Sequence, residues 1–155
     1  MKISDIIYVF LCSMVPIIEL RGAIPLGATL ELPFYLNYII CVIGNMIPVP
    51  FILLFIRHIL NWMKRLPKLD NIAIWVENKA EKNKAKVLKY ATFGLFFFVA
   101  LPLPGTGAWT GSLVAAMLDM RLKKAIPAIF LGVMTAGVIM TLASYGFLSF
   151  LDFLL

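Results

Sequence analysis

Charged side chains are scarce in this sequence. Asp, Glu, Lys and Arg make up 14% of the 155 residues and hydrophobic residues 62%, whereas about 25% charged residues are usual in a soluble domain. No charged residue occurs in 35–56, 91–118 or 125–151. This composition excludes an ordinary soluble protein and predicts an integral membrane protein whose single domain covers residues 1–155.

Residues that carry metal or nucleophilic chemistry are also few. The sequence has one histidine, His58, and two cysteines, Cys12 and Cys41, in separate apolar stretches. Their spacing is not that of a metal cluster or a disulfide framework, and no Ser or Cys motif has an evident base. We therefore expect no enzymatic activity, no metal and no cofactor.

Two of the uncharged stretches are long enough to cross a membrane. A helix needs about 20 apolar residues to span a hydrocarbon core of roughly 30 Å. The sequence therefore predicts transmembrane helices over 35–60 and 125–151. The apolar N-terminal run is not expected to be a cleaved signal peptide, because no small-residue cleavage site follows it.

The other two apolar segments are broken near their middles. Residues 1–34 contain Pro16 in an apolar run, and residues 91–118 contain the Pro- and Gly-rich run 102–107. Pro and Gly interrupt helices, and arms of about 11 residues reach roughly 17 Å, too short to span a bilayer. Each segment is therefore predicted to be a re-entrant helical hairpin.

The distribution of basic residues predicts the orientation in the membrane. Eight of the 14 basic residues lie in the linker 61–90, and three more lie in the loop 119–124. By the positive-inside rule both segments are cytoplasmic and both termini are outside, in a multi-pass protein of the cell membrane. An amphipathic helix in 61–90 would rest on anionic lipid, and we expect no nucleic-acid partner, since no nucleic-acid module is present.

The order of hairpin and spanning helix occurs twice along the chain. A shift of 86 residues lays Pro16 on Pro102, and a shift of 88 lays Gly44 on Gly132. Each unit makes an odd number of crossings, so the two copies have opposite orientations. The predicted fold is all-α, an inverted repeat of a re-entrant hairpin and a transmembrane helix, as in many secondary transporters.

The motifs ELRGAIP, from Glu19 to Pro25, and PLPGTGAWTG, from Pro102 to Gly111, resemble the small multidrug export protein family over nearly the whole chain. The layout is similar, more distantly, to DedA membrane proteins, which share paired re-entrant hairpins. Those proteins are implicated in recycling lipid carriers such as undecaprenyl phosphate, with proton coupling. The second motif of that group contains an Arg. In this chain the second motif has no Arg, and Arg21 lies in the first motif instead.

The two charged residues of the first motif are the principal functional candidates. An ionisable residue at bilayer depth costs at least about 2.5–3.5 kcal/mol and usually marks a substrate path or a proton relay. In the functional interpretation, Arg21 binds an anionic headgroup and Glu19 couples protons or binds a cationic substrate. In the structural interpretation, they pair with each other or with polar backbone and hold the hairpin loop shut.

The glycine-rich run of the second motif would open a helix whose free N–H groups can hold a phosphate or carboxylate, or it would form only a tight turn. Asn45, before Pro48 and Pro50, either faces the same cavity or packs between helices. The predicted substrate-binding residues are Glu19, Arg21, Gly22, Pro25, Pro104, Gly105, Thr106, Gly107, Trp109 and Thr110.

Together these features predict a small transporter that moves an amphiphilic, anionic substrate such as a lipid phosphate, with proton coupling. The first alternative is a small multidrug exporter of cationic drugs, and the second is a membrane scaffold without transport activity. Membrane lipids are the expected partners, and a second copy of the chain is expected to seal the cavity in a homodimer.

Overall fold

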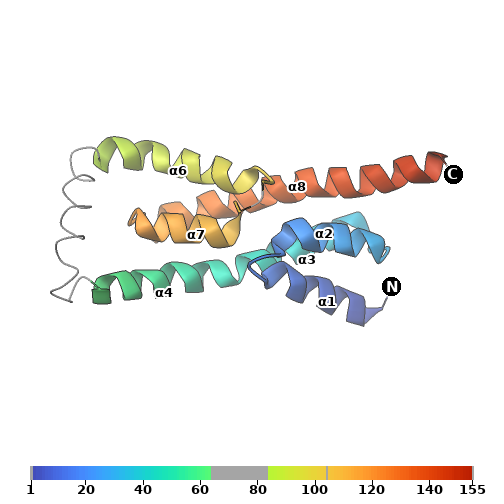
Figure 1. Ribbon diagram of the computed structural model, residues 1–155, viewed down its shortest axis with the longest axis horizontal. Coiled ribbons are helices and arrows are strands. Elements are labelled where there is room, and N and C mark those ends of the chain that lie inside the picture. The colour runs from blue at the N-terminus through green and yellow to red at the C-terminus, as the bar shows by residue number, and fades with distance from the viewer. Residues whose placement is uncertain (1, 64–83, 104, 155) are drawn as a thin grey trace.

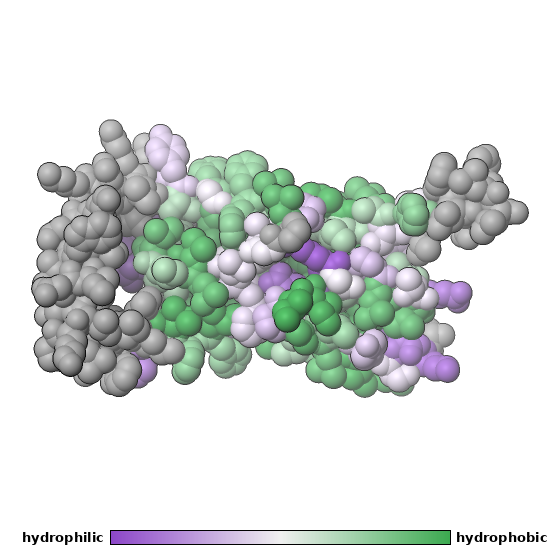
Figure 2. Space-filling model, viewed as in Figure 1, coloured by the Kyte–Doolittle hydropathy of each residue, from purple (hydrophilic) through white to green (hydrophobic). Residues whose placement is uncertain are grey.

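The computed structural model describes residues 2–63, 84–103 and 105–154, and within them the chain forms helices and no strand. Green, hydrophobic residues cover most of the face shown in Figure 2. Large apolar side chains such as Phe51, Phe93 and Leu142 are 68–70% exposed. An apolar surface of this extent is compatible with lipid and not with water.

The first hairpin consists of α1 (Ile3–Met14) and α2 (Glu19–Thr29), which pack against each other. Pro16 lies directly after the end of α1, where its missing N–H cannot continue the helix. Both helices are shorter than a membrane crossing requires.

The first predicted span is a broken helix. It consists of α3 (Phe34–Met46) and α4 (Pro48–Met63), separated at Ile47. Phe34–Ile56 is long and apolar enough to cross a membrane. The break follows from Pro48 and Pro50, which cannot donate to the helix ladder, and Pro48 takes the first position of α4, where that donor is not needed.

The second broken segment contains α6 (Lys84–Ala100) and α7 (Ala108–Met117). Helix α6 begins before residue 91, because lysines are good helix formers. The amphipathic helix predicted in the linker falls largely on 64–83, outside the described residues. The last helix, α8 (Leu122–Leu154), contains the second candidate span, Leu122–Phe147.

The two hairpins lie at opposite ends of the molecule, with their tips at its middle. In Figure 1, α1 and α6 run toward the middle from opposite ends, and α2 and α7 run back from there. Helices α3 and α4, one after the other, run antiparallel to α8, and α1 begins at the end where α8 finishes.

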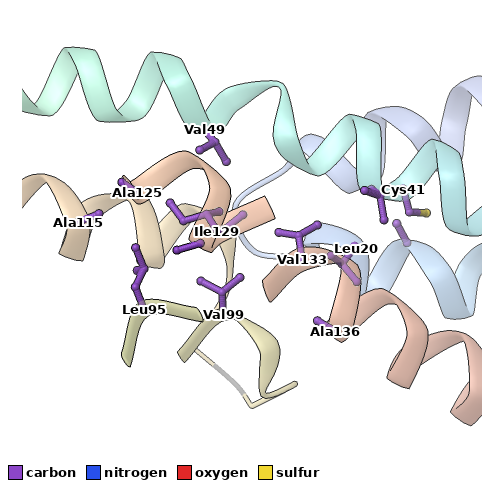
Figure 3. Packing of buried hydrophobic residues seen from close by; sticks show 14 of the residues in the cluster. Leu20, Cys41, Val49, Leu95, Val99, Ala115, Ala125, Ile129, Val133 and Ala136 are labelled. Atoms are coloured by element: carbon purple, nitrogen blue, oxygen red, sulfur yellow. The ribbon is translucent and has the colours of Figure 1, made fainter. Parts of the chain in front are cut away.

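The helices of the two hairpins pack on the long helices in a similar pattern. Helix α1 packs on α3 as α6 packs on α8, whereas α2 packs on α8 and α7 packs on α4. The buried core continues through both halves, and Figure 3 shows Leu95 and Val99 of α6 directed toward Ile129 of α8.

Two glycines make similar contacts between a hairpin helix and a long helix. A Cβ on Gly44 would overlap the Ser13 hydroxyl and lie 2.9 Å from the Phe10 carbonyl oxygen. A Cβ on Gly132 would lie 2.7 Å from the Val99 Cβ and 3.0 Å from the Phe96 carbonyl oxygen. Phe10 and Ser13 shifted by 86 residues are Phe96 and Val99, and Gly44 shifted by 88 is Gly132. Each glycine therefore permits the same close contact between a hairpin helix and a spanning helix.

Candidate functional site

The first hairpin places a carboxylate at its tip. Glu19 begins α2 with a left-handed backbone (φ 49°), and its side chain is only 5% exposed. Its N–H donates to the Val15 carbonyl at 2.9 Å, which closes the turn between the two helices. A non-glycine residue in this backbone region is strained, and such strain is concentrated at functional sites.

The Arg21 side chain binds the end of the other hairpin's first helix. Its Nη2 donates to the carbonyl oxygens of Leu101 at 2.8 Å and Val99 at 3.2 Å. Its Nη1 donates to the carbonyl oxygens of Leu103 at 2.7 Å and Thr106. The Val99 carbonyl belongs to the last turn of α6, and the other three carbonyls follow that helix, so the positive charge of the guanidinium stands at the negative end of α6.

The Glu19 carboxylate binds the start of the other hairpin's second helix. Its Oε1 accepts a hydrogen bond of 3.1 Å from the N–H of Trp109, in the first turn of α7. Gly107, with φ 144°, precedes α7, and a Cβ at this position would overlap the Glu19 carboxylate. The negative charge of Glu19 thus stands at the positive end of α7, where a residue other than glycine would block it.

The second hairpin also binds the first. The Trp109 indole Nε1 donates to the Met14 carbonyl at 3.1 Å, near the end of α1. Within the second loop, the Thr106 hydroxyl donates to the carbonyl oxygens of Leu101 and Leu103, both at 2.9 Å. Side chains of each tip therefore cap the broken helices of the other.

The other predicted site residues belong to the loop before α7 and to helices α2 and α7. Gly105 has φ 80°, is exposed, and has open space where a Cβ would project. Gly22 and Pro25 lie within α2, where a Cβ on Gly22 would come 2.6 Å from Ile18 Cγ2. Thr110 is partly buried in the first turn of α7, and Pro104 lies outside the described residues.

Sequence reasoning named polar backbone as a possible partner of Arg21 and Glu19, but not which backbone groups they bind. The partners of Arg21 are backbone carbonyls about 80 residues away, and no residue type marks a carbonyl as a partner. It also missed Asn37, which is fully buried and donates to the Ile24 carbonyl at 2.8 Å and the Tyr145 hydroxyl at 3.0 Å. An asparagine in an uncharged span was the available signal, because a buried amide needs partners.

An open apolar groove lies beside the contact between the two tips. It has a volume of about 710 Å³ and is lined by Phe51, Ile52, Leu54, Phe55, His58 and Trp109. Trp109 belongs both to the groove, which it lines, and to the contact between the tips, where its backbone N–H donates to Glu19. The groove can hold an apolar group beside Trp109.

Metal-binding side chains do not cluster in the part of the chain that the structure describes. There, no three His, Cys, Asp or Glu side chains gather in a way that could hold a metal ion. Cys12 and Cys41 are buried free thiols. The contact between the tips is instead suited to binding, because it combines opposite charges with opened backbone.

The helical fold, the apolar surface and the two candidate spans define a helical membrane protein, consistent with a location in the cell membrane. A family model described as "Putative small multi-drug export protein" matches residues 19–139, and the chain belongs to this family. The description indicates an export protein rather than an enzyme. Comparison with curated proteins found no match, and neither did comparison with solved structures.

Proposed function

We propose that the protein is a small secondary transporter of amphiphilic substrates, which bind where the two hairpin tips meet. The observation that carries this proposal is the reciprocal capping, in which Arg21 binds the end of α6 and Glu19 binds the start of α7. Discontinuous helices that meet inside a membrane domain are the usual setting of substrate sites in secondary transporters.

The agreement between the two halves supports an inverted repeat with re-entrant hairpins. The Gly44 and Gly132 contacts are equivalent, and the helices that carry them are antiparallel. Because each half packs its second hairpin helix on the other half's span, the substrate site lies between the halves. In the proposed topology, which follows the positive-inside rule, both termini are outside and residues 61–90 and 119–124 are cytoplasmic.

An anionic substrate competes for the donors of Arg21. In this structure both terminal nitrogens of its guanidinium donate to backbone carbonyls. A phosphate that takes these donors, in the bidentate geometry that Arg favours, releases the end of α6. Binding is thereby coupled to separation of the tips, as transport requires. A lipid phosphate fits this scheme, with its apolar part in the groove and Glu19 able to carry the coupled proton.

Export of a cationic drug is the second candidate function. Glu19 is a nearly buried carboxylate whose backbone partner, Trp109, lines an aromatic groove. A cation that enters the groove is attracted by aromatic faces and by this carboxylate. The family description also agrees with drug export.

Transport assays in proteoliposomes across a pH gradient distinguish the candidates. We expect Arg21→Ala to abolish movement of a lipid phosphate, while Glu31→Gln and Arg121→Ala, which change charges away from the tips, leave it unchanged. Movement of a cationic dye that depends on Glu19 and not on Arg21 would favour drug export. If correctly folded protein moves neither substrate, the same hydrogen bonds support the scaffold alternative.

A further inference from the structure

Asn45 is an exception among the buried polar side chains of the described residues. It lies on α3 and has no exposed surface, and neither its amide nitrogen nor its amide oxygen has a hydrogen-bond partner. Asn37, on the same helix and equally buried, has both of its amide atoms paired. A buried amide without partners is costly, so a native protein usually supplies a partner or a ligand.

The backbone beside Asn45 is also short of donors. Pro48 and Pro50 have no N–H, so the carbonyls of Gly44 and Met46 lack the donors that an unbroken helix would provide. Against Gly44 lies the hydroxyl of Ser13, which donates to the Phe10 carbonyl and keeps its lone pairs. One turn of the first span thus carries several oxygen acceptors, beginning at the buried residues Gly44 and Asn45.

The other half of the molecule has no such set. Val133 stands where the first half has Asn45, and it has no exposed surface. Val99 stands in place of Ser13, and Ala136 in place of Pro48, so α8 continues without a break. The same packing is therefore achieved with apolar side chains, which means that the polar residues are not needed for packing.

We propose that Asn45, with the freed carbonyls at the break of the first span, forms a binding site for a small monovalent cation such as Na⁺. The acceptors outnumber the donors, which favours a cation. The set contains no carboxylate, which disfavours divalent ions. Freed backbone carbonyls of discontinuous helices are typical ligands of Na⁺ in transporters. A role of this ion in coupling rests on the proposed transport function, whereas its binding does not.

The thermal stability of the purified protein in detergent tests the binding. A ligand that binds only the folded state raises the Tm with its concentration. We expect the Tm to rise when NaCl replaces choline chloride at constant ionic strength. Asn45→Val introduces the residue type found at the corresponding position, Val133. We expect this variant to fold and to lose the Na⁺-dependent rise in Tm.

Two further variants complete the test. Thr141→Val removes another buried hydroxyl without a partner, on α8 and away from the break, and should retain the full Na⁺-dependent rise. If Asn45→Val fails to fold, Ser13→Ala takes its place as the test and should weaken the Na⁺-dependent rise in Tm. The proposal is overturned if the wild-type Tm does not respond to Na⁺, or if Asn45→Val responds as strongly as the wild type. A rise in Tm without transport activity would contradict the proposed function alone.

Discussion

Glu31 and Asp119, which are 88 residues apart, have nearly the same left-handed backbone conformation, with φ angles of 58° and 50°. Each directly follows the last turn of the second helix of a hairpin. The next residues, Leu32 and Met120, donate to carbonyls five residues earlier, both at 3.0 Å. Both helices therefore end in the same C-terminal capping motif, which normally has glycine at the left-handed position.

Replacing these acidic residues with glycine should stabilise the protein. A left-handed conformation costs a non-glycine residue about 1–2 kcal/mol, partly offset by the greater chain entropy of glycine. We expect Glu31→Gly and Asp119→Gly each to raise the stability by up to about 1 kcal/mol, measured by thermal unfolding in detergent. Glu31→Ala removes the charge and retains the strain, so a similar gain in that variant would attribute the effect to charge.

The same two positions test the orientation of the halves. Single cysteines at Glu31 and Asp119, in a Cys12→Ala/Cys41→Ala background, should be labelled by impermeant reagents from opposite sides of the membrane. In the proposed topology the second hairpin is re-entrant, so Asp119 is on the cytoplasmic side. If 91–118 instead crosses the membrane once as a kinked helix, both cysteines react from outside.

Loss of Arg21 should be strongly destabilising. Its guanidinium donates to four backbone carbonyls, and hydrogen bonds to a charged group contribute about 1.5–3 kcal/mol each. We expect Arg21→Ala to lower the stability by at least about 2 kcal/mol, and Arg21→Lys to restore little of it, since an ammonium lacks the planar fork. Arg121→Ala, at an exposed position, is the matched control and should change stability by less than about 0.5 kcal/mol.

Substitution of Gly107 should depend on Glu19. A Cβ on Gly107 overlaps the carboxylate, so Gly107→Ala should lower the Tm much more than Gly105→Ala, whose Cβ enters open space. In a Glu19→Ala background the Gly107→Ala penalty should shrink, and the difference measures the coupling between the two residues. Equal penalties in both backgrounds would show that backbone strain alone causes the effect.

The sequence was a good guide to the helical class and the two candidate spans, because a lack of charge over 20 residues leaves few alternatives to a membrane helix. The Pro- and Gly-rich runs also predicted where helices stop. Helix α6 begins at Lys84, within the linker 61–90, because hydropathy marks the membrane boundary and not the end of a helix that extends beyond it.

The candidate site was predicted only in part. Glu19 and Arg21 stand out because charge is rare in apolar segments. Their partners do not, since one guanidinium binding four carbonyls across the two tips is a property of the fold. In the structure both side chains bind polar backbone, as the structural interpretation expects. Their binding of a substrate or a proton stays a prediction.

The break at Ile47 lies between two groups of packed helices. Helix α3 packs with α1 and α2, whereas α4 packs with α7, and α8 is continuous alongside both groups. A bend at Ile47 would move α4, together with α7 packed on it, relative to the continuous helix α8. The hinge of such a movement lies next to Asn45, so an occupant of this turn would set how freely the two groups move apart.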